Sequence, residues 1–80
     1  MEKDVLMFGI AREINGGPSC TLTLGEDATI GDIRKALAEK YSEFHNLTSF
    51  MVAKNSEYAE DTEVIAVNDE IAIIPPVSGG

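Results

Sequence analysis

DEIAIIPPVSGG, residues 69–80, constrains the fold more tightly than any other stretch of the chain. Its apolar run, Ile71–Ile74, lies between Glu70 and Pro75, and a short bounded run of this kind is typical of a buried strand. Pro75 and Pro76 end that strand, because proline has no N–H to donate to a sheet. The stretch therefore predicts a strand at residues 70–74, followed by a stiff stem and a slim tail.

Both faces of this strand are apolar, since Ile71 and Ile73 alternate with Ala72 and Ile74. The first apolar segment, Val5–Ala11, has the same property and is also predicted to be a strand. One face of such strands can bury against a helix of the chain. The opposite face needs a second cover, and we expect a protein partner to provide it. Loops of the same chain, or small side chains on that face, are the alternative.

Three further segments have the composition of short strands. Cys20–Leu24 alternates polar and apolar residues after the turn-forming Asn15–Pro18, which predicts a hairpin with the first strand. Phe50–Ala53 predicts another strand, Glu57–Ala59 follows a turn signal, and Val64–Ala66 is either a short strand or a bend. The sheet is therefore expected to contain four or five strands.

One main helix is predicted from residue 30 to about residue 41. Its apolar residues recur at spacings of three and four, which places them on one face: Ile30, Ile33, Leu37 and Tyr41. Thr29 precedes this stripe and Asp32 follows three residues later, as in a capping box. The order of elements predicts an α+β fold, with a mixed sheet and the helix on one of its faces.

Composition limits the classes of function. Eighty residues leave room for one domain, and 44% hydrophobic residues are typical of a globular chain. A net charge of −8 disfavours nucleic acid and anionic membranes, and either keeps the domain soluble or attracts a basic partner. We expect a cytoplasmic location, since Met1–Asp4 lacks signal-peptide features and Cys20 has no partner for an internal disulfide.

Side chains offer little support for catalysis inside the domain. His45 is the single histidine, and no metal site is expected. Cys20 lies in a predicted strand, where cysteine behaves as a small apolar residue; the alternative is a nucleophile activated by a base. The acidic run Glu60–Glu63 lacks the spaced ligands and the glycine of a calcium loop, which favours a solvated loop.

The tail is the remaining candidate for chemistry. Pro75 and Pro76 favour an extended polyproline geometry where the chain leaves the sheet. Ser78, Gly79 and Gly80 have almost no bulk, so a thread about 20 Å long, at roughly 3.3 Å per residue, suits a narrow channel in another protein. The Gly80 carboxylate is ionised at neutral pH and can attack ATP held by a separate enzyme. The alternative is an inert, disordered chain end.

At these residues the chain resembles the small subunits of molybdopterin synthase, which are ubiquitin-like sulfur carriers. The most specific match is residues 69–80, similar to family endings in PPVSGG or PPVTGG. Phe8–Glu13 is similar to the family's FA..RE pattern, with Gly9 where alanine is usual, and Ala53–Asn55 is close to an AVN hairpin. Two isoleucines at 73–74 replace a frequent aromatic pair, which keeps the surface apolar but reduces its ring area.

The resemblance implies a fold, a reaction and two partners. The fold is a β-grasp over residues 1–76, with residues 77–80 as a flexible tail. An adenylating enzyme activates Gly80 with ATP, and sulfur then replaces one oxygen to give a thiocarboxylate. The tail enters the large subunit of molybdopterin synthase, where its sulfur passes to cyclic pyranopterin monophosphate. The chain is then a non-catalytic subunit of a heterotetramer and binds no cofactor of its own.

The resemblance also assigns roles to individual residues. The residues expected in the partner's channel are Pro75, Pro76, Val77, Ser78 and Gly79. The residues expected at the subunit interface are Phe8, Arg12, Ile73 and Ile74. The alternative places these last four in the core or on an ordinary surface, since the direction of a sheet face is not fixed by sequence.

Two rival functions stay open at this point. One is a sulfur carrier for another pathway, such as thiazole synthesis, or a modifier of proteins that uses the same Gly-Gly ending. Thiazole carriers tend to be shorter and lack the Pro-Pro-Val stem, which argues against that pathway. The other is a non-covalent ubiquitin-like binding domain whose tail is inert.

Overall fold

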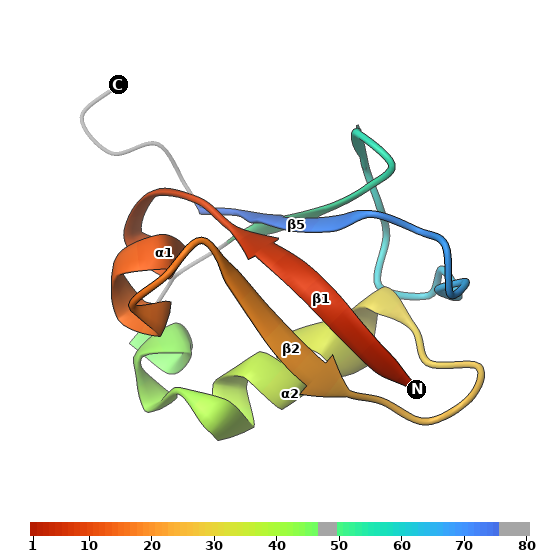
Figure 1. Cartoon of the computed structure of the whole chain (residues 1–80), viewed down its shortest axis with the longest axis horizontal. Helices are drawn as coiled ribbons and strands as arrows, with labels where there is room; N and C mark the ends of the chain where they lie inside the picture. The colour runs from red at the N-terminus through yellow and green to blue at the C-terminus, as the bar shows by residue number, and fades with distance from the viewer. Residues whose placement is uncertain (47–49, 76–80) are drawn as a thin grey trace.

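The computed structural model describes residues 1–46 and 50–75, and within them five strands form one mixed sheet (Figure 1). The strands are β1 (Glu2–Met7), β2 (Ser19–Thr23), β3 (Met51–Lys54), β4 (Glu57–Tyr58) and β5 (Ile71–Ile74). Their order is β2-β1-β5-β3-β4, with β1 and β5 parallel and the other neighbours antiparallel. The helical elements are α1 (Gly9–Asn15), α2 (Ile30–Lys40) and the 3-10 helix η1 (Ser42–Asn46). The predicted α+β class and mixed sheet are confirmed.

The predicted helix is confirmed as α2, and so is its N-terminal cap. The Thr29 hydroxyl accepts a hydrogen bond from the Asp32 N–H at 3.3 Å, and the Asp32 carboxylate accepts one from the Thr29 N–H at 2.9 Å. The first of these bonds gives the Asp32 N–H a second acceptor beside the Thr29 carbonyl at 3.0 Å, and the second satisfies the Thr29 N–H at the start of the helix. The cap therefore fixes where α2 begins relative to the sheet.

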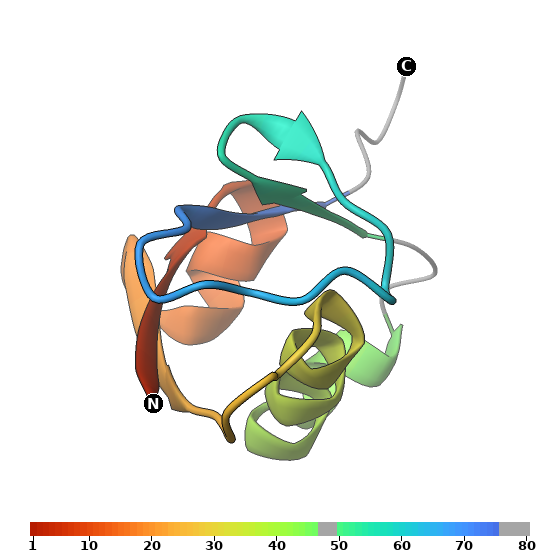
Figure 2. The same ribbon diagram turned by 90° about the vertical axis from the view of Figure 1, so that its right-hand side faces the viewer.

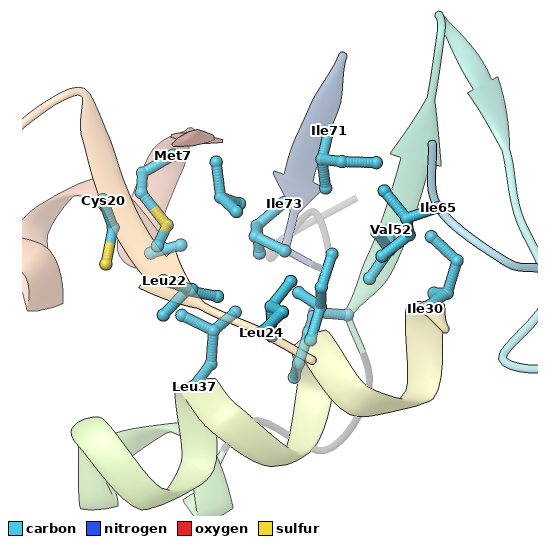
Figure 3. Packing of buried hydrophobic residues seen from close by; sticks show 14 of the residues in the cluster. Met7, Cys20, Leu22, Leu24, Ile30, Leu37, Val52, Ile65, Ile71 and Ile73 are labelled. Atoms are coloured by element: carbon cyan, nitrogen blue, oxygen red, sulfur yellow. The ribbon is translucent and has the colours of Figure 1, made fainter. Parts of the chain in front are cut away.

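The core lies between α2 and the face of the sheet that we call the inner face (Figure 3). Alternate residues of the central strands point into it, and the helix contributes its apolar stripe. The largest fully buried side chains of this core are Val5, Met7, Ile30, Ile33, Leu37, Val52, Ile71 and Ile73. Each strand therefore presents only one of its two faces to the rest of the chain.

Helix α1 was not predicted, and the predicted strand over Val5–Ala11 is wrong beyond Met7. Gly9 has a φ of +54°, which turns the chain out of the strand into the helix. Ala11 then packs into the core, and Gly16 ends the helix in a left-handed conformation at φ +77°. A continuous apolar run has no period, so it does not show where a strand gives way to a helix.

The long connection from β4 to β5 runs beside α2 (Figure 2). The N–H groups of Ile30 and Gly31 donate to the carbonyls of Glu63 and Asp61, each at 2.9 Å, so the connection pairs with the start of the helix. Its carboxylates also form ion pairs within the chain, since Asp61 accepts from Arg34 at 2.7 Å and Glu63 lies 3.2 Å from Lys54. Hydrogen bonds and ion pairs thus hold the acidic run against the start of α2 and against β3.

A polar network holds the chain where it enters β5. The Lys3 ammonium is buried and donates to the carbonyls of Ala66, Val67 and Asp69 at 2.8–3.0 Å. The Asp69 carboxylate accepts from the Ala66 N–H at 2.7 Å and from the Asn55 amide at 2.8 Å. This network fixes the chain at Asp69, just before β5 begins, at the end of the strand opposite to Pro75.

Among the residues that the structure describes, no helix has the length and apolar character needed to cross a membrane.

Candidate functional site

The outer face of the sheet, opposite the core, carries an apolar groove of about 340 Å³, which we call the outer groove. β1, β3, β4 and β5 all contribute to it, because each strand sends every second side chain to this face. Its apolar lining consists of Leu6, Phe8, Ala53, Tyr58, Ala72 and Ile74. Two polar residues, Ser56 and Glu70, complete the lining. This is the uncovered apolar face that the sequence predicts.

Large side chains of the outer groove remain open to solvent. Tyr58 is 67% exposed and Phe8 is 48% exposed, and the neighbouring Met51 on β3 is 42% exposed. Exposed aromatic side chains that gather around an apolar floor are typical of a surface that binds another protein. The apolar floor and the exposed aromatic residues therefore favour the binding of another protein as the role of this groove.

The structure separates the four residues expected at the interface. Phe8 and Ile74 line the outer groove, and Arg12 is exposed on α1. Ile73 is wrong as an interface residue, because its side chain has no exposed surface and points into the core from the inner face of β5. Ile73 and Ile74 are adjacent in a strand, so only one of them reaches each face.

Pro75 lies at the edge of the described site. It is half-buried directly after β5, and its ring lies against Gly9, at the start of α1. The predicted tail positions Pro76, Val77, Ser78, Gly79 and Gly80 lie outside the described residues. The tail therefore begins where β5 leaves the sheet, beside the groove residue Ile74.

Cys20 is buried at 5% exposure on the inner face of β2, within the core (Figure 3). This position is that of a small apolar core residue, as expected for a cysteine in a strand. Within the described part of the chain, two carboxylates in loops have lowered pKa values. The Ala66 N–H and the Asn55 amide lower the pKa of Asp69, and the Glu60 N–H and Lys54 lower that of Glu63.

Leu6, Ala72 and Tyr58 contribute to the groove, although none was assigned a role from sequence. Leu6 is two residues from Phe8, and Ala72 is two residues from Ile74, so alternation along a strand is sufficient to place each pair on one face. Tyr58 gave one signal, an aromatic residue in a very short segment between turns. Gly9 gave a weaker signal, a glycine inside an apolar run, which marks a break or a close approach of backbone.

Comparison with known proteins gives matches over almost the whole chain. A family model described as the ThiS family matches residues 5–80. The molybdopterin synthase sulfur carrier subunit of Arabidopsis thaliana is 38% identical over 81 residues, covering 100% of this chain and 84% of that protein. These matches include the tail residues that the structure does not describe.

Solved structures match the fold of the chain equally widely. The crystal structure of SAMP1 from Haloferax volcanii, a small archaeal modifier protein, has a TM-score of 0.84 and 28% identity, covering 100% of both chains. A complex of subunits 1 and 2 of molybdopterin-converting factor from Helicobacter pylori contains a chain with a TM-score of 0.68 and 23% identity, again covering 100% of both. The second match concerns the fold alone.

Proposed function

The chain belongs to the ThiS family, and from this premise we propose that it is the sulfur carrier subunit of a molybdopterin synthase. One observation carries the proposal: residues along the entire chain match a curated protein of that name at 38% identity. The outer groove supports it, because a carrier subunit needs a surface for the enzyme that it serves. The root of the tail at Pro75 adjoins that surface.

In this function the reacting group is the carboxylate of Gly80. A carboxylate oxygen attacks the α-phosphate of ATP on a separate activating enzyme, and pyrophosphate leaves. A sulfur donor then displaces AMP from the acyl-adenylate, which leaves a thiocarboxylate at Gly80. The thiocarboxylate sulfur is a softer and better nucleophile than the original oxygen. The chain itself contributes the sulfur and no catalytic side chain.

The two partners in this proposal are the activating enzyme and the large subunit of the synthase. A chain with the fold of this one belongs to the complex of subunits 1 and 2 of the Helicobacter pylori converting factor, which supports a partner subunit here. We assign the outer groove to the large subunit, with Phe8 and Ile74 as contacts next to the tail. ATP belongs to the activating enzyme, and no cofactor is assigned to this chain.

The experiment that tests this function is intact-mass measurement of the full chain after incubation with the activating enzyme, ATP and a sulfur donor. We expect a species heavier by one exchange of oxygen for sulfur. A variant that lacks Gly80 serves as the control and is expected to stay unchanged. If the full chain also stays unchanged while a known carrier gains sulfur in the same mixture, the proposed function is wrong.

A second candidate function is favoured by the likeness to the small archaeal modifier protein. In that case the activated Gly80 is joined to an amino group of another protein. The same incubation, with cell extract added, separates the two functions. A modifier gives new covalent species of higher mass that contain this chain, whereas a sulfur carrier gives the thiocarboxylate alone.

A further inference from the structure

Gly9 and Pro75 meet where two parallel strands leave the sheet. β1 and β5 pair in parallel, and their last matched residues are Met7 and Ile73. The same register carried on by two residues places Gly9 opposite Pro75. At this point β1 turns into α1, and β5 passes into the stem of the tail. The contact therefore lies between the folded domain and the segment that carries the proposed reacting group.

The contact exists because Gly9 has no side chain. A Cβ on Gly9 would lie 3.0 Å from Cγ of Pro75 and 3.9 Å from its Cδ. Non-bonded carbon atoms normally rest about 3.5–4.0 Å apart, so the shorter of these distances is a clash. The proline ring is closed onto its own backbone, so Cγ can give way only by a change of ring pucker or by a shift of the stem.

Gly9 also has a backbone conformation that other residues avoid. Its φ is +54°, in the left-handed region, where a Cβ approaches the neighbouring carbonyl oxygen. A residue with a side chain at this position is driven to another φ and also against the Pro75 ring.

We propose that Gly9 is a positioning residue that seats the ring of Pro75 and so sets the direction in which the tail leaves the sheet. The inference rests on the proposed function and concerns how the Gly80 carboxylate reaches its partners. A seated stem holds a larger fraction of tail conformations ready to enter a channel. The apparent affinity of a partner for the chain scales with that fraction.

Gly16 provides a matched control for a substitution at Gly9. It ends the same helix, has a φ of +77°, and has nothing within 4 Å of the position of a Cβ. Gly16→Ala therefore imposes the left-handed strain without any contact with the stem. Gly9→Ala imposes a similar strain together with the clash against Pro75. A difference between the two variants isolates the contact from the general cost of losing a glycine.

The test measures adenylation of the full chain by its activating enzyme over a range of carrier concentrations. We expect Gly9→Ala to raise KM by about three- to tenfold at an unchanged kcat, because fewer tail conformations are ready to bind. Gly16→Ala is expected to keep KM within about twofold of the original. Equal KM values for the two folded variants would overturn the proposal, and thermal unfolding records the folded fraction of each.

Pro75→Ala tests the same contact from the other side. It removes the ring and keeps Gly9, so KM is expected to rise as it does for Gly9→Ala. Gly9→Ala in the Pro75→Ala background is expected to add little further loss, since the ring that it meets is absent. An undiminished effect in that background, or an unchanged KM for Pro75→Ala, contradicts the proposal. If Gly9→Ala does not fold, an unchanged KM for Pro75→Ala still overturns the proposal.

A structural readout separates this inference from the proposed function. If the unaltered chain is not adenylated at all, the proposed function fails. The contact between Gly9 and the Pro75 ring is then tested by NMR alone. The amide shifts of Ser78, Gly79 and Gly80 are expected to change in Gly9→Ala and to stay constant in Gly16→Ala. Equal amide shifts for these three residues in the two variants would overturn the proposed role of Gly9, whatever the activity of the chain.

Discussion

The two faces of β5 differ in what covers them. On the inner face, Ile71 and Ile73 are completely buried beneath α2, and the chain supplies all of the packing. On the outer face, Ala72 and Ile74 form the floor of a groove whose aromatic residues Phe8 and Tyr58 stay exposed. The difference shows that one strand can hold the domain together with one face while the other face remains available to a partner.

The largest effect is expected for Ile73→Ala, which tests the inner face. Removing most of a fully buried side chain costs transfer free energy and leaves a cavity, about 2–5 kcal/mol in all. Urea unfolding followed by circular dichroism measures the loss. A loss below about 1 kcal/mol would show that the inner face is not a close-packed core and would remove the contrast between the faces.

A somewhat smaller effect is expected for Lys3→Met, at the polar edge of the same face. The substitution keeps the length of the side chain and removes its three bonds to the carbonyls of Ala66, Val67 and Asp69. Because desolvation of the ammonium offsets part of what these bonds contribute, we expect a net loss of about 1.5–3 kcal/mol in the free energy of unfolding. Lys35→Met, on the exposed side of α2, is the control and is expected to leave stability unchanged.

Ile74→Ala tests the outer face, where the expected effect is on binding. We expect its affinity for the large subunit to fall by about 1–2 kcal/mol, roughly 5- to 30-fold in Kd, with a smaller change in stability than for Ile73→Ala. Isothermal titration calorimetry measures the affinity. Val67→Ala removes an exposed apolar side chain outside the groove and is expected to leave Kd unchanged. A similar loss in both variants would contradict the assignment of the groove.

The smallest effect is expected from pH. The pKa values of Asp69 and Glu63 are lowered in the fold by N–H and amide donors, from ordinary values of 3.8 and 4.5. Lowered pKa values stabilise the folded chain at pH values above these ordinary values, and the contribution is lost as pH falls through the folded values. The midpoint of thermal unfolding should therefore drop as the pH falls below these ordinary values. The unfolding midpoint of Asp69→Asn should fall by less than that of the unaltered chain over the same change of pH. An equal fall would show that other carboxylates cause the effect.

Sequence patterns predicted the parts of the fold in which polarity and spacing agree. The stripe from Ile30 to Leu37 and the Thr29–Asp32 cap determine α2, because only a helix places these residues together. The limits of β5 follow from Glu70 and Pro75, which bound a short apolar run. In both cases a polar residue or a proline marks the boundary.

The misses lie where the sequence is apolar without interruption. Val5–Ala11 gives no period, so the change from β1 to α1 at Gly9 depends on a backbone angle that the composition does not report. Ile73 and Ile74 are the same residue type, so hydrophobicity does not say which one faces the core. Only the packing of α2 against one face of the sheet makes that choice.

Sulfur transfer from the tail is the central claim, and one measurement tests it most directly. The chain, treated with activating enzyme, ATP and a sulfur donor, is mixed with the large subunit and cyclic pyranopterin monophosphate, and the molybdopterin formed is quantified. The account predicts product with the full chain and none with a chain that lacks Gly80. Equal amounts of product from the two chains would contradict it.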